Sequence, residues 1–386
     1  MTRTAKTGVR TALSRVLLAA AVVVPLGAAA AMTPAAASAN PVVPNHIGLP
    51  PAGPEGELYL PEVDSERIVV ISTKTNRVTR VIPMTGGASK PAVMAVAGNK
   101  LYSNNFGQFP PTVTVLNRVT GSVKNIPTIT ASLGAFSSKD GKYVYLPEES
   151  NVVQVIDTRT DQIVHNFWYP MTPVGSIEGP DGLLYIGFAP GFIAAVDPHT
   201  GAWVKPPIFT GGIAPFWYTW SKDGKKLYVD TVNTIGVIDM KSWSLTKVIN
   251  TSPDGIWGVG NPGAFTSTLS PDGSKLYVTM FGRSNVLVID AKTDKVIHEI
   301  PTLGDTPSVI FSDDGTRGYI SDLGASSQNH PTFIGEGILF AKLVLFGTLG
   351  PGQLDVFDLR TDRVLGQIPV GNGPGIPAWV PPLNAR

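Results

Sequence analysis

Acidic residues that could bind a divalent cation are spread along the chain instead of forming one motif. Glu148 and Glu149 are adjacent, whereas Asp230, Asp305 and Asp322 each stand alone. Calcium needs about six to eight oxygen ligands, so these carboxylates form a site only if the fold brings several of them together. Adjacent side chains on a strand point to opposite faces, which favours a solvated pair at Glu148 and Glu149. We therefore expect no cofactor. Calcium stays open, with Glu149, Asp230 and Asp322 as its candidate ligands.

Other signs of catalytic chemistry are scarce. The histidines are scattered, and no two are spaced as ligands of one metal ion; they are His46, His165, His199, His298 and His330. The chain has no Gly-x-Ser-x-Gly nucleophile motif and no cysteine, so thiolate metal sites, cysteine nucleophiles and disulfides are excluded. No assembled active site is recognisable, and the sequence favours a protein that is not an enzyme.

Tyrosines recur along most of the chain at about the length of one propeller blade, roughly 40 to 50 residues. The repeating ones are Tyr59, Tyr102, Tyr145, Tyr185, Tyr228, Tyr277 and Tyr319. Such spacing is too long for a single hairpin and is typical of four-stranded units around a central channel.

A second motif follows each tyrosine and predicts both a strand and the turn that ends it. Two apolar residues precede an Asp, Ser or Asn, and a residue that tolerates positive φ usually stands four positions later. The best copies are residues 155–161, 288–294 and 356–362; 195–201 and 237–243 are variants, and weaker copies begin their turns at Ser72 and Asn117. Upstream of most tyrosines an Asp-Gly pair predicts a further hairpin. Each unit thus consists of strand a, strand b with the tyrosine, strand c and strand d.

The two ends of the repeat region are complementary. Residues 57–60 form a strand b with no strand a before it, and residues 376–380 form a lone strand a. Joining them in one blade leaves no open edge at the seam. We predict an all-β protein: a seven-bladed β-propeller of four-stranded antiparallel blades over residues 57–386, closed by a C-terminal strand a with N-terminal strands b, c and d.

The repeats resemble a known family at the residues Leu276-Tyr277-Val278-Thr279, followed by 286–290 and 293–296. They are similar to the YVTN-type repeat of YncE-like and surface-layer-associated β-propellers, over roughly residues 57 to 381. The resemblance implies an exported propeller, from a family whose members are mostly binding or structural proteins.

The N-terminus has the composition of a secretory signal peptide. Four basic residues precede an apolar run over residues 16–32, and Ala37-Ser38-Ala39 offers a cleavage site. We predict a signal peptide at 1–39, an extension at 40–56, and a secreted or cell-envelope location reached by the general secretory route. An uncleaved membrane anchor is the alternative, although the run is short for a bilayer. Without the signal peptide, acidic residues slightly outnumber basic ones, so nucleic acid is an unlikely partner. We expect a monomer.

The connections from b to c and from d to a open on one face of the ring, which we call the variable face because their lengths differ. Variable loops on a rigid scaffold are the usual place for binding. Candidate residues for a small molecule, a glycan or an envelope protein are Asn104, Asn105, Phe106, Phe109, Glu148, Glu149, Asp230, Trp257, Arg283, Asp322 and His330. Phe216, Trp217 and Trp220 also lie there, and for these we favour packing between blades.

The longest variable connection is an insertion at residues 322–352, between Tyr319 and Asp358. It becomes apolar across 333–346 but is interrupted by Glu336 and Lys342, so it is too short to span a bilayer. It could be a lid, a docking element for a partner or lipid surface, or a short helix or hairpin packed on a neighbouring blade.

Two hypotheses about function remain. The first is an exported, non-catalytic binding propeller with a ligand or partner at the variable face. The alternative is a propeller enzyme, a lactonase-like hydrolase or lyase, with a carboxylate-bound divalent cation at the mouth of the channel. They differ in whether acidic side chains from several blades converge.

Overall fold

The structure is a computed structural model that describes residues 47–84, 90–106, 110–231, 234–251, 263–325 and 350–383. The chain divides into two units, residues 1–39 and 40–386, and everything below concerns the second. The predicted signal peptide lies outside the described residues. In the described ranges no helix is long and apolar enough to cross a membrane.

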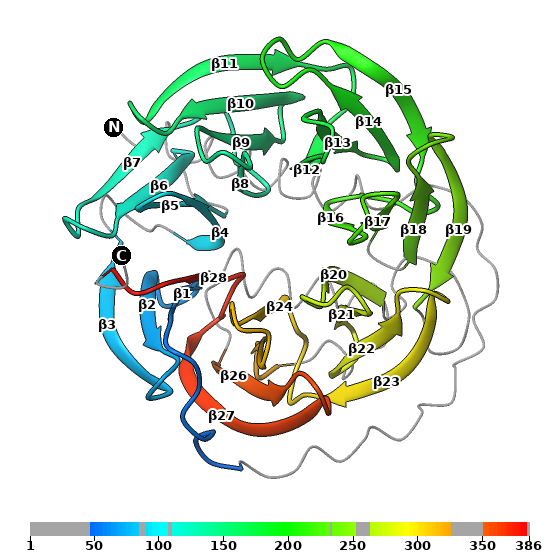
Figure 1. Ribbon diagram of the computed structural model, residues 1–386. Coiled ribbons are helices and arrows are strands. Elements are labelled where there is room, and N and C mark those ends of the chain that lie inside the picture. Colours follow the sequence, from blue (N-terminus) through cyan, green and yellow to red (C-terminus); the bar gives the residue numbers. More distant parts are fainter. Residues whose placement is uncertain are drawn as a thin grey trace, which may run out of the picture. The chain divides into compact units, whose positions relative to one another are not determined.

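Seven four-stranded antiparallel sheets follow one another around a ring, and no helix occurs in the described part of the chain (Figure 1). The prediction of a seven-bladed β-propeller is confirmed. Blade 1 contains β28 (Ala378–Val380), β1 (Glu57–Glu62), β2 (Arg67–Ser72) and β3 (Arg77–Pro83); blade 2 contains β4 (Pro91–Ala97), β5 (Lys100–Asn105), β6 (Thr112–Asn117) and β7 (Val123–Pro127). Blade 3 contains β8 (Phe136–Ser137), β9 (Tyr143–Glu148), β10 (Val152–Asp157) and β11 (Gln162–Trp168).

The remaining blades repeat this order, with the first strand nearest the centre. Blade 4 contains β12 (Pro173–Glu178), β13 (Leu184–Phe188), β14 (Phe192–Val196) and β15 (Trp203–Phe209); blade 5 contains β16 (Trp217–Trp220), β17 (Lys226–Asp230), β18 (Thr234–Asp239) and β19 (Ser244–Asn250). Blade 6 contains β20 (Gly263–Leu269), β21 (Lys275–Phe281), β22 (Asn285–Asp290) and β23 (Lys295–Pro301); blade 7 contains β24 (Ser308–Phe311), β25 (Arg317–Asp322), β26 (Pro351–Asp358) and β27 (Arg363–Asn372).

The hydrophobic core is divided among the contacts between blades. All seven repeating tyrosines are buried in second strands. Seven apolar clusters each join two neighbouring blades, and one of them joins blade 7 to blade 1 through residues such as Leu58 and Val356. Burial of apolar surface therefore holds the ring together blade by blade, including at the seam.

The turns between third and fourth strands confirm the motif that predicts them. Four residues after the Asp, Ser or Asn, the backbone φ is positive in every blade, at Asn76, Gly121, Asp161, Gly201, Trp243, Asp294 and Asp362. Trp243 is the unusual one because its side chain disfavours this conformation. Its indole Nε1 donates to the Pro206 carbonyl at 2.8 Å, and its ring lies 5.7 Å from that of Tyr185. These contacts stabilise the left-handed turn without glycine or asparagine.

The ring closes as predicted, with the C-terminal strand completing the N-terminal blade. β28 pairs antiparallel with β1, with Leu58 opposite Trp379 and Tyr59 opposite Ala378. The same C-terminal segment also contacts blade 2, because the Ile376 N–H donates to the Ala92 carbonyl at 2.8 Å. Blade 1 is thus completed by both ends of the propeller.

Residues 47–56 cross the seam between blades 7 and 1, and we call this segment the strap. Gln367 on the outer strand β27 binds it twice, by its N–H to the Gly48 carbonyl and by its Oε1 to the Ile47 N–H. On blade 1, the Asn76 Nδ2 donates to the carbonyls of Pro50 and Pro51 at 2.9 and 2.8 Å. The strap therefore connects the last blade to the first in addition to β28.

Candidate functional site

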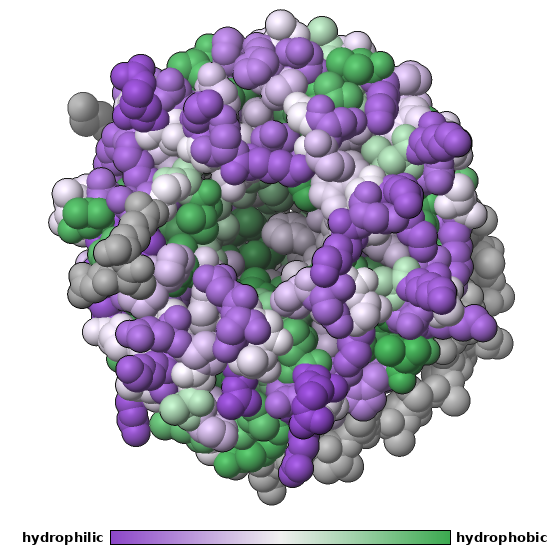
Figure 2. Space-filling view, viewed as in Figure 1, coloured by the Kyte–Doolittle hydropathy of each residue, from purple (hydrophilic) through white to green (hydrophobic). Residues whose placement is uncertain are grey.

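The variable face surrounds the channel at the centre of the ring. On the face seen in Figure 2 the molecule is hollowed at the centre of the ring, and apolar side chains lie inside the hollow while hydrophilic residues surround it. Most of the residues singled out in the sequence belong to strand ends and loops on the variable face. Their contacts fall into three groups: buried amide and carboxyl groups, loop residues, and a group of aromatic rings.

The two asparagines of β5 are buried and hydrogen-bonded to protein groups. Asn104 accepts from the Val93 N–H and donates to the Ser132 carbonyl, both at 2.9 Å, so it links blades 2 and 3. Asn105 donates to the hydroxyls of Thr112 and Thr114 within its own blade, also at 2.9 Å. Their side chains stabilise the loops of this face.

Glu148 and Glu149 point to opposite sides at the end of β9. Glu149 is exposed, whereas Glu148 is fully buried. The Glu148 Oε2 accepts from the Thr130 N–H at 2.8 Å, and its Oε1 has no hydrogen-bond partner among the described residues. Burial raises the pKa of Glu148 to about 7. Glu148 therefore caps a backbone amide in the connection that enters its own blade.

Asp230, at the end of β17, is completely buried between blades 5 and 6. Its Oδ2 accepts from the Ser267 hydroxyl at 2.7 Å, and its Oδ1 has no partner in the described part of the chain. Burial raises the pKa of Asp230 to about 8. A neutral carboxylic acid at pH 7 is a poor ligand for a cation, because metal ligands must be deprotonated.

Asp322 and Asp355 form a buried, hydrogen-bonded carboxyl pair in blade 7. Asp322 accepts from the N–H groups of Leu303, Gly304 and Gly324 at 2.7, 2.9 and 2.8 Å, which stabilises its ionised form. Burial, followed by the charge of Asp322, raises the pKa of Asp355 well above its usual range. Asp355 therefore keeps the proton of the pair, and its O–H donates a hydrogen bond to the Asp322 carboxylate.

The acidic side chains do not converge on one centre. Glu148, Asp230 and Asp322 each interact with groups of their own or the adjacent blade, and Asp305 is buried in the connection between blades 6 and 7. Within the described ranges, no group of three His, Cys, Asp or Glu side chains could hold a metal ion.

Other predicted site residues lie in loops. The Arg283 Nη2 bonds to the Glu299 Oε2 at 2.9 Å, and the Phe106 N–H donates to the Lys90 carbonyl. Phe109, Trp257 and His330, together with residues 326–349 of the predicted insertion, lie outside the described residues.

Half-buried aromatic rings form a continuous group at the variable face. The Phe265 ring, on the innermost strand of blade 6, stacks on Phe281 at 3.9 Å and an interplanar angle of 17°. Phe216, just before β16, lies 4.7 Å from Phe265 on the other side. We call these three rings the aromatic stack. Trp217 and Phe136 extend the aromatic lining to blade 3, with ring centroids 5.9 Å apart.

Packing accounts for the remaining aromatic candidate. Trp220 lies 5.1 Å from Tyr185 and belongs to the core between blades 4 and 5. Phe216 and Trp217 also make contacts between blades: Phe216 lies on Phe265 of blade 6, and the Trp217 Nε1 donates to the Ser267 carbonyl at 2.9 Å. Both rings stay partly exposed. Sequence reasoning missed Phe265 and Phe136, which lie on first strands, and Asp355, which lies on a third strand. For Phe265 and Phe136 the available signal was their position in the repeat, because first strands line the channel.

Comparisons with known proteins support the fold and leave the family open. No protein-family model matches the chain. A curated relative, Antigen Lp49 of Leptospira interrogans, is 32% identical over 161 residues, which is 40% of this chain and 31% of that protein. This chain therefore matches less than a third of the relative's length.

Solved structures with similar folds include proteins of unknown function and an enzyme. A functionally unknown protein from Desulfotomaculum acetoxidans has a TM-score of 0.62 at 16% identity, covering 85% of this chain and 100% of its own. A protein from Lactobacillus plantarum has a TM-score of 0.63 at 14% identity, covering 84% and 99%. Dihydro-heme d1 dehydrogenase NirN has a TM-score of 0.57 at 16% identity, covering 88% and 78%. At these identities the likeness shows the fold alone.

Proposed function

We propose that this protein is an exported, non-catalytic β-propeller of the YVTN type that binds a small molecule with a flat apolar face at its variable face. The aromatic stack of Phe216, Phe265 and Phe281 is the observation that carries the proposal. The Phe265 and Phe281 rings are nearly parallel, and the Phe216 ring lies against Phe265 at an interplanar angle of 47°. None of the three is fully buried, so together they offer an aromatic surface beside the channel. Ligand sites are usually concave and lined by apolar and aromatic side chains with a few polar groups.

The buried carboxyl groups support a binding protein over the metal-dependent hydrolase or lyase. Each has protein donors or a neutral form that suits burial, and each stabilises the scaffold around the stack. Export is supported by the composition of residues 1–39 and by the description of the partial relative as an antigen. Sequencing the N-terminus of protein recovered from the cell envelope or medium tests export: a mature chain that begins at Asn40 is expected, and an intact Met1 contradicts it.

Ligand-observed NMR with naphthalene-based fragments tests the aromatic stack. Saturation transfer is expected for the wild-type chain and is expected to disappear in Phe265→Ala, which removes the central ring. Phe209→Ala is the matched control, because Phe209 is an exposed aromatic on the outer strand of blade 4. Equal transfer in all three proteins, or none in the wild type, contradicts the proposal. A rise in Tm with calcium that Asp230→Asn abolishes would instead favour the enzyme.

A further inference from the structure

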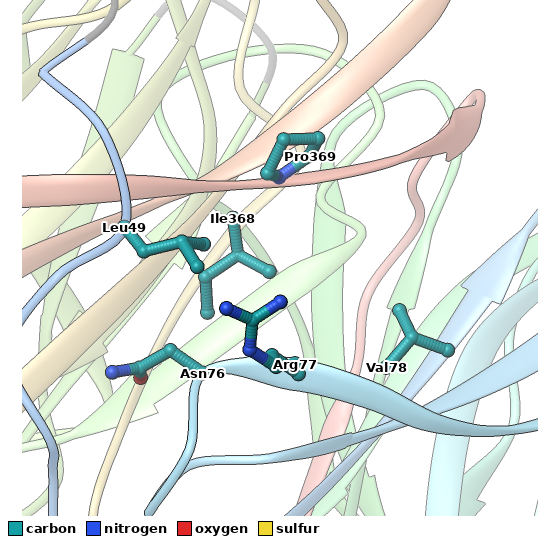
Figure 3. A pocket seen from close by; sticks show the side chains of 6 residues that line it. All are labelled: Leu49, Asn76, Arg77, Val78, Ile368 and Pro369. Atoms are coloured by element: carbon teal, nitrogen blue, oxygen red, sulfur yellow. The ribbon is translucent and has the colours of Figure 1, made fainter.

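A cavity of about 400 Å³ that is open to solvent lies at the seam between blades 7 and 1, and the side chains of Leu49 and Val78 on its rim are exposed. It is lined by Leu49 of the strap, by Asn76, Arg77 and Val78 at the start of β3, and by Ile368 and Pro369 of β27. Its volume falls within the usual range for small-molecule sites. Figure 3 shows the Arg77 guanidinium beside the neighbouring apolar side chains of Leu49 and Ile368. The cavity thus combines apolar walls with one cationic group.

Hydrogen bonds of the strap hold these walls in place without a ligand. The Gln367 N–H and Oε1 fix Gly48 and Ile47, on one side of Leu49. On its other side, the Asn76 Nδ2 fixes the carbonyls of Pro50 and Pro51. A preformed site loses less conformational entropy when a ligand binds.

Arg77 has no partner among the described residues that would neutralise its charge. Two other arginines near strand ends do have one: Arg67 pairs with Glu62, and Arg118 pairs with Glu57 at 3.2 Å. The exposed Arg363, at the start of β27, has no ion pair among the described residues. The nearest charged pair in sequence, Lys74 and Glu55, is spaced at 4.0 Å and does not include Arg77. A guanidinium is always charged and presents a planar pair of donors that matches a carboxylate.

From this geometry we infer that the cavity binds an alkyl carboxylate of medium length, such as a fatty acid. The carboxylate bonds to the Arg77 guanidinium, and the alkyl chain lies against Leu49, Val78 and Ile368. The single cationic group of Arg77 balances one negative charge. A phosphate with further polar substituents would lack hydrogen-bond partners for those substituents along the apolar walls. This site is independent of the aromatic stack.

Isothermal titration calorimetry of the full chain with octanoate tests the inference. Binding is expected for octanoate and not for octanol, which has the same chain without the charge. Arg77→Gln is expected to weaken octanoate binding at least about tenfold, as for loss of a charge-assisted hydrogen bond. Leu49→Ala is expected to weaken it less, by about the loss of a partly exposed apolar contact.

Two control variants distinguish binding at Arg77 from binding elsewhere on the protein. Arg360→Gln removes another exposed arginine, in the turn of blade 7, and should leave octanoate binding unchanged. Phe265→Ala should also leave it unchanged, so failure at the aromatic stack and failure here are distinguishable. Equal binding of octanol and octanoate, or unchanged binding in Arg77→Gln, overturns the inference. If an acetylated peptide that ends in leucine binds more tightly than octanoate, the ligand of the cavity is the C-terminus of a peptide, and the inference of a fatty acid is overturned.

Discussion

At the scale of single residues, buried acidic groups serve the backbone of the variable face. Glu62, Glu148 and Asp322 each follow a repeating tyrosine by three positions. Glu148 and Asp322 accept from an amide of the connection that enters their own blade, and Glu62 accepts from the Gly371 N–H at the end of β27. These connections cross the end of a blade. Their N–H groups have no neighbouring strand to bond to there, and not all of them can reach water. Capping of these amides therefore accounts for two of the acidic residues considered as possible metal ligands, Glu148 and Asp322.

Asp230 makes the stability of the protein depend on pH. Its pKa is raised to about 8 by burial, while in the unfolded chain it is about 3.9. Between these values the folded state binds more protons, so raising the pH through this window destabilises the fold. Asp230→Asn removes this contribution, and urea denaturation at pH 5 and pH 8 should show a smaller loss of unfolding free energy than in the wild type.

The exposed Asp313 provides the control for this measurement. Asp313→Asn should lose as much stability between pH 5 and pH 8 as the wild type, because Asp313 lies at the surface of a turn. A loss in Asp230→Asn as large as in the wild type would show that Asp230 is ionised in the folded state.

At the scale of elements, three blade contacts share one polar arrangement. Where a second strand contains Lys-Leu-Tyr, the next blade has Asp at the positive-φ position of its turn. Both the Lys and the Tyr bond to that Asp, as Lys275 and Tyr277 do to Asp362 at 2.6 and 2.5 Å. Lys100 with Asp161 and Lys226 with Asp294 repeat it at 2.8 and 3.2 Å.

Three of the other four contacts have different residues in these places, and at the fourth, between blades 7 and 1, the buried Tyr319 hydroxyl has no hydrogen-bond partner among the described residues. Glu57 precedes Tyr59 in the place of the lysine, and Arg118 in the turn of blade 2 supplies the opposite charge. Trp243 occupies the Asp position opposite Tyr185, and Gly201 occupies it opposite Tyr145. The residues at the turn therefore differ together with those of the neighbouring strand, which favours one order of blades around the ring.

Asp362→Asn tests the polar arrangement. Asparagine keeps the preference for positive φ but leaves Lys275 and Tyr277 without an ionised acceptor, so the unfolding free energy should fall by about 1–3 kcal/mol. Chemical denaturation measures it. Asp313→Asn should change it by less than about 0.5 kcal/mol, as a surface substitution does. If both variants behave alike, the bonds to Asp362 contribute nothing net.

At the scale of the whole molecule, closure depends on one short C-terminal strand. Ile376, Ala378 and Val380 are buried, and the ring of Trp379 lies 5.8 Å from that of Tyr319 in blade 7. Without these residues β1 becomes an open edge, and blades 1, 2 and 7 lose shared apolar contacts.

A chain that ends at Gly375 should therefore lose stability and associate through the open edge. We expect a fall of about 3–6 kcal/mol in unfolding free energy, from about 1.5–3 kcal/mol for each of two large buried side chains. Denaturation and sedimentation measure the two effects. Removal of only residues 384–386 serves as the control and should change neither. A truncated chain that stays monomeric with the Tm of the wild type would show that the strap alone closes the ring.

The sequence by itself determined the number of blades, the strand order, the turns and the closure, because each depends on local patterns that repeat along the chain. The apolar strand residues, the Asp-Gly turns and the positive-φ position act within a few residues of one another. The tyrosine spacing also assigned each loop to a face.

Only the tertiary structure decided which side chains meet on that face. Asp322 and Asp355 look independent in the sequence, yet the register of β25 and β26 brings them together as a proton-sharing pair. Phe216, Phe265 and Phe281 are ordinary strand-end aromatics until two blades place them in one stack. The cavity at Arg77 needs the strap and both ends of the ring. Such contacts depend on how blades sit against each other, because the partners are far apart in the chain and no local pattern couples them.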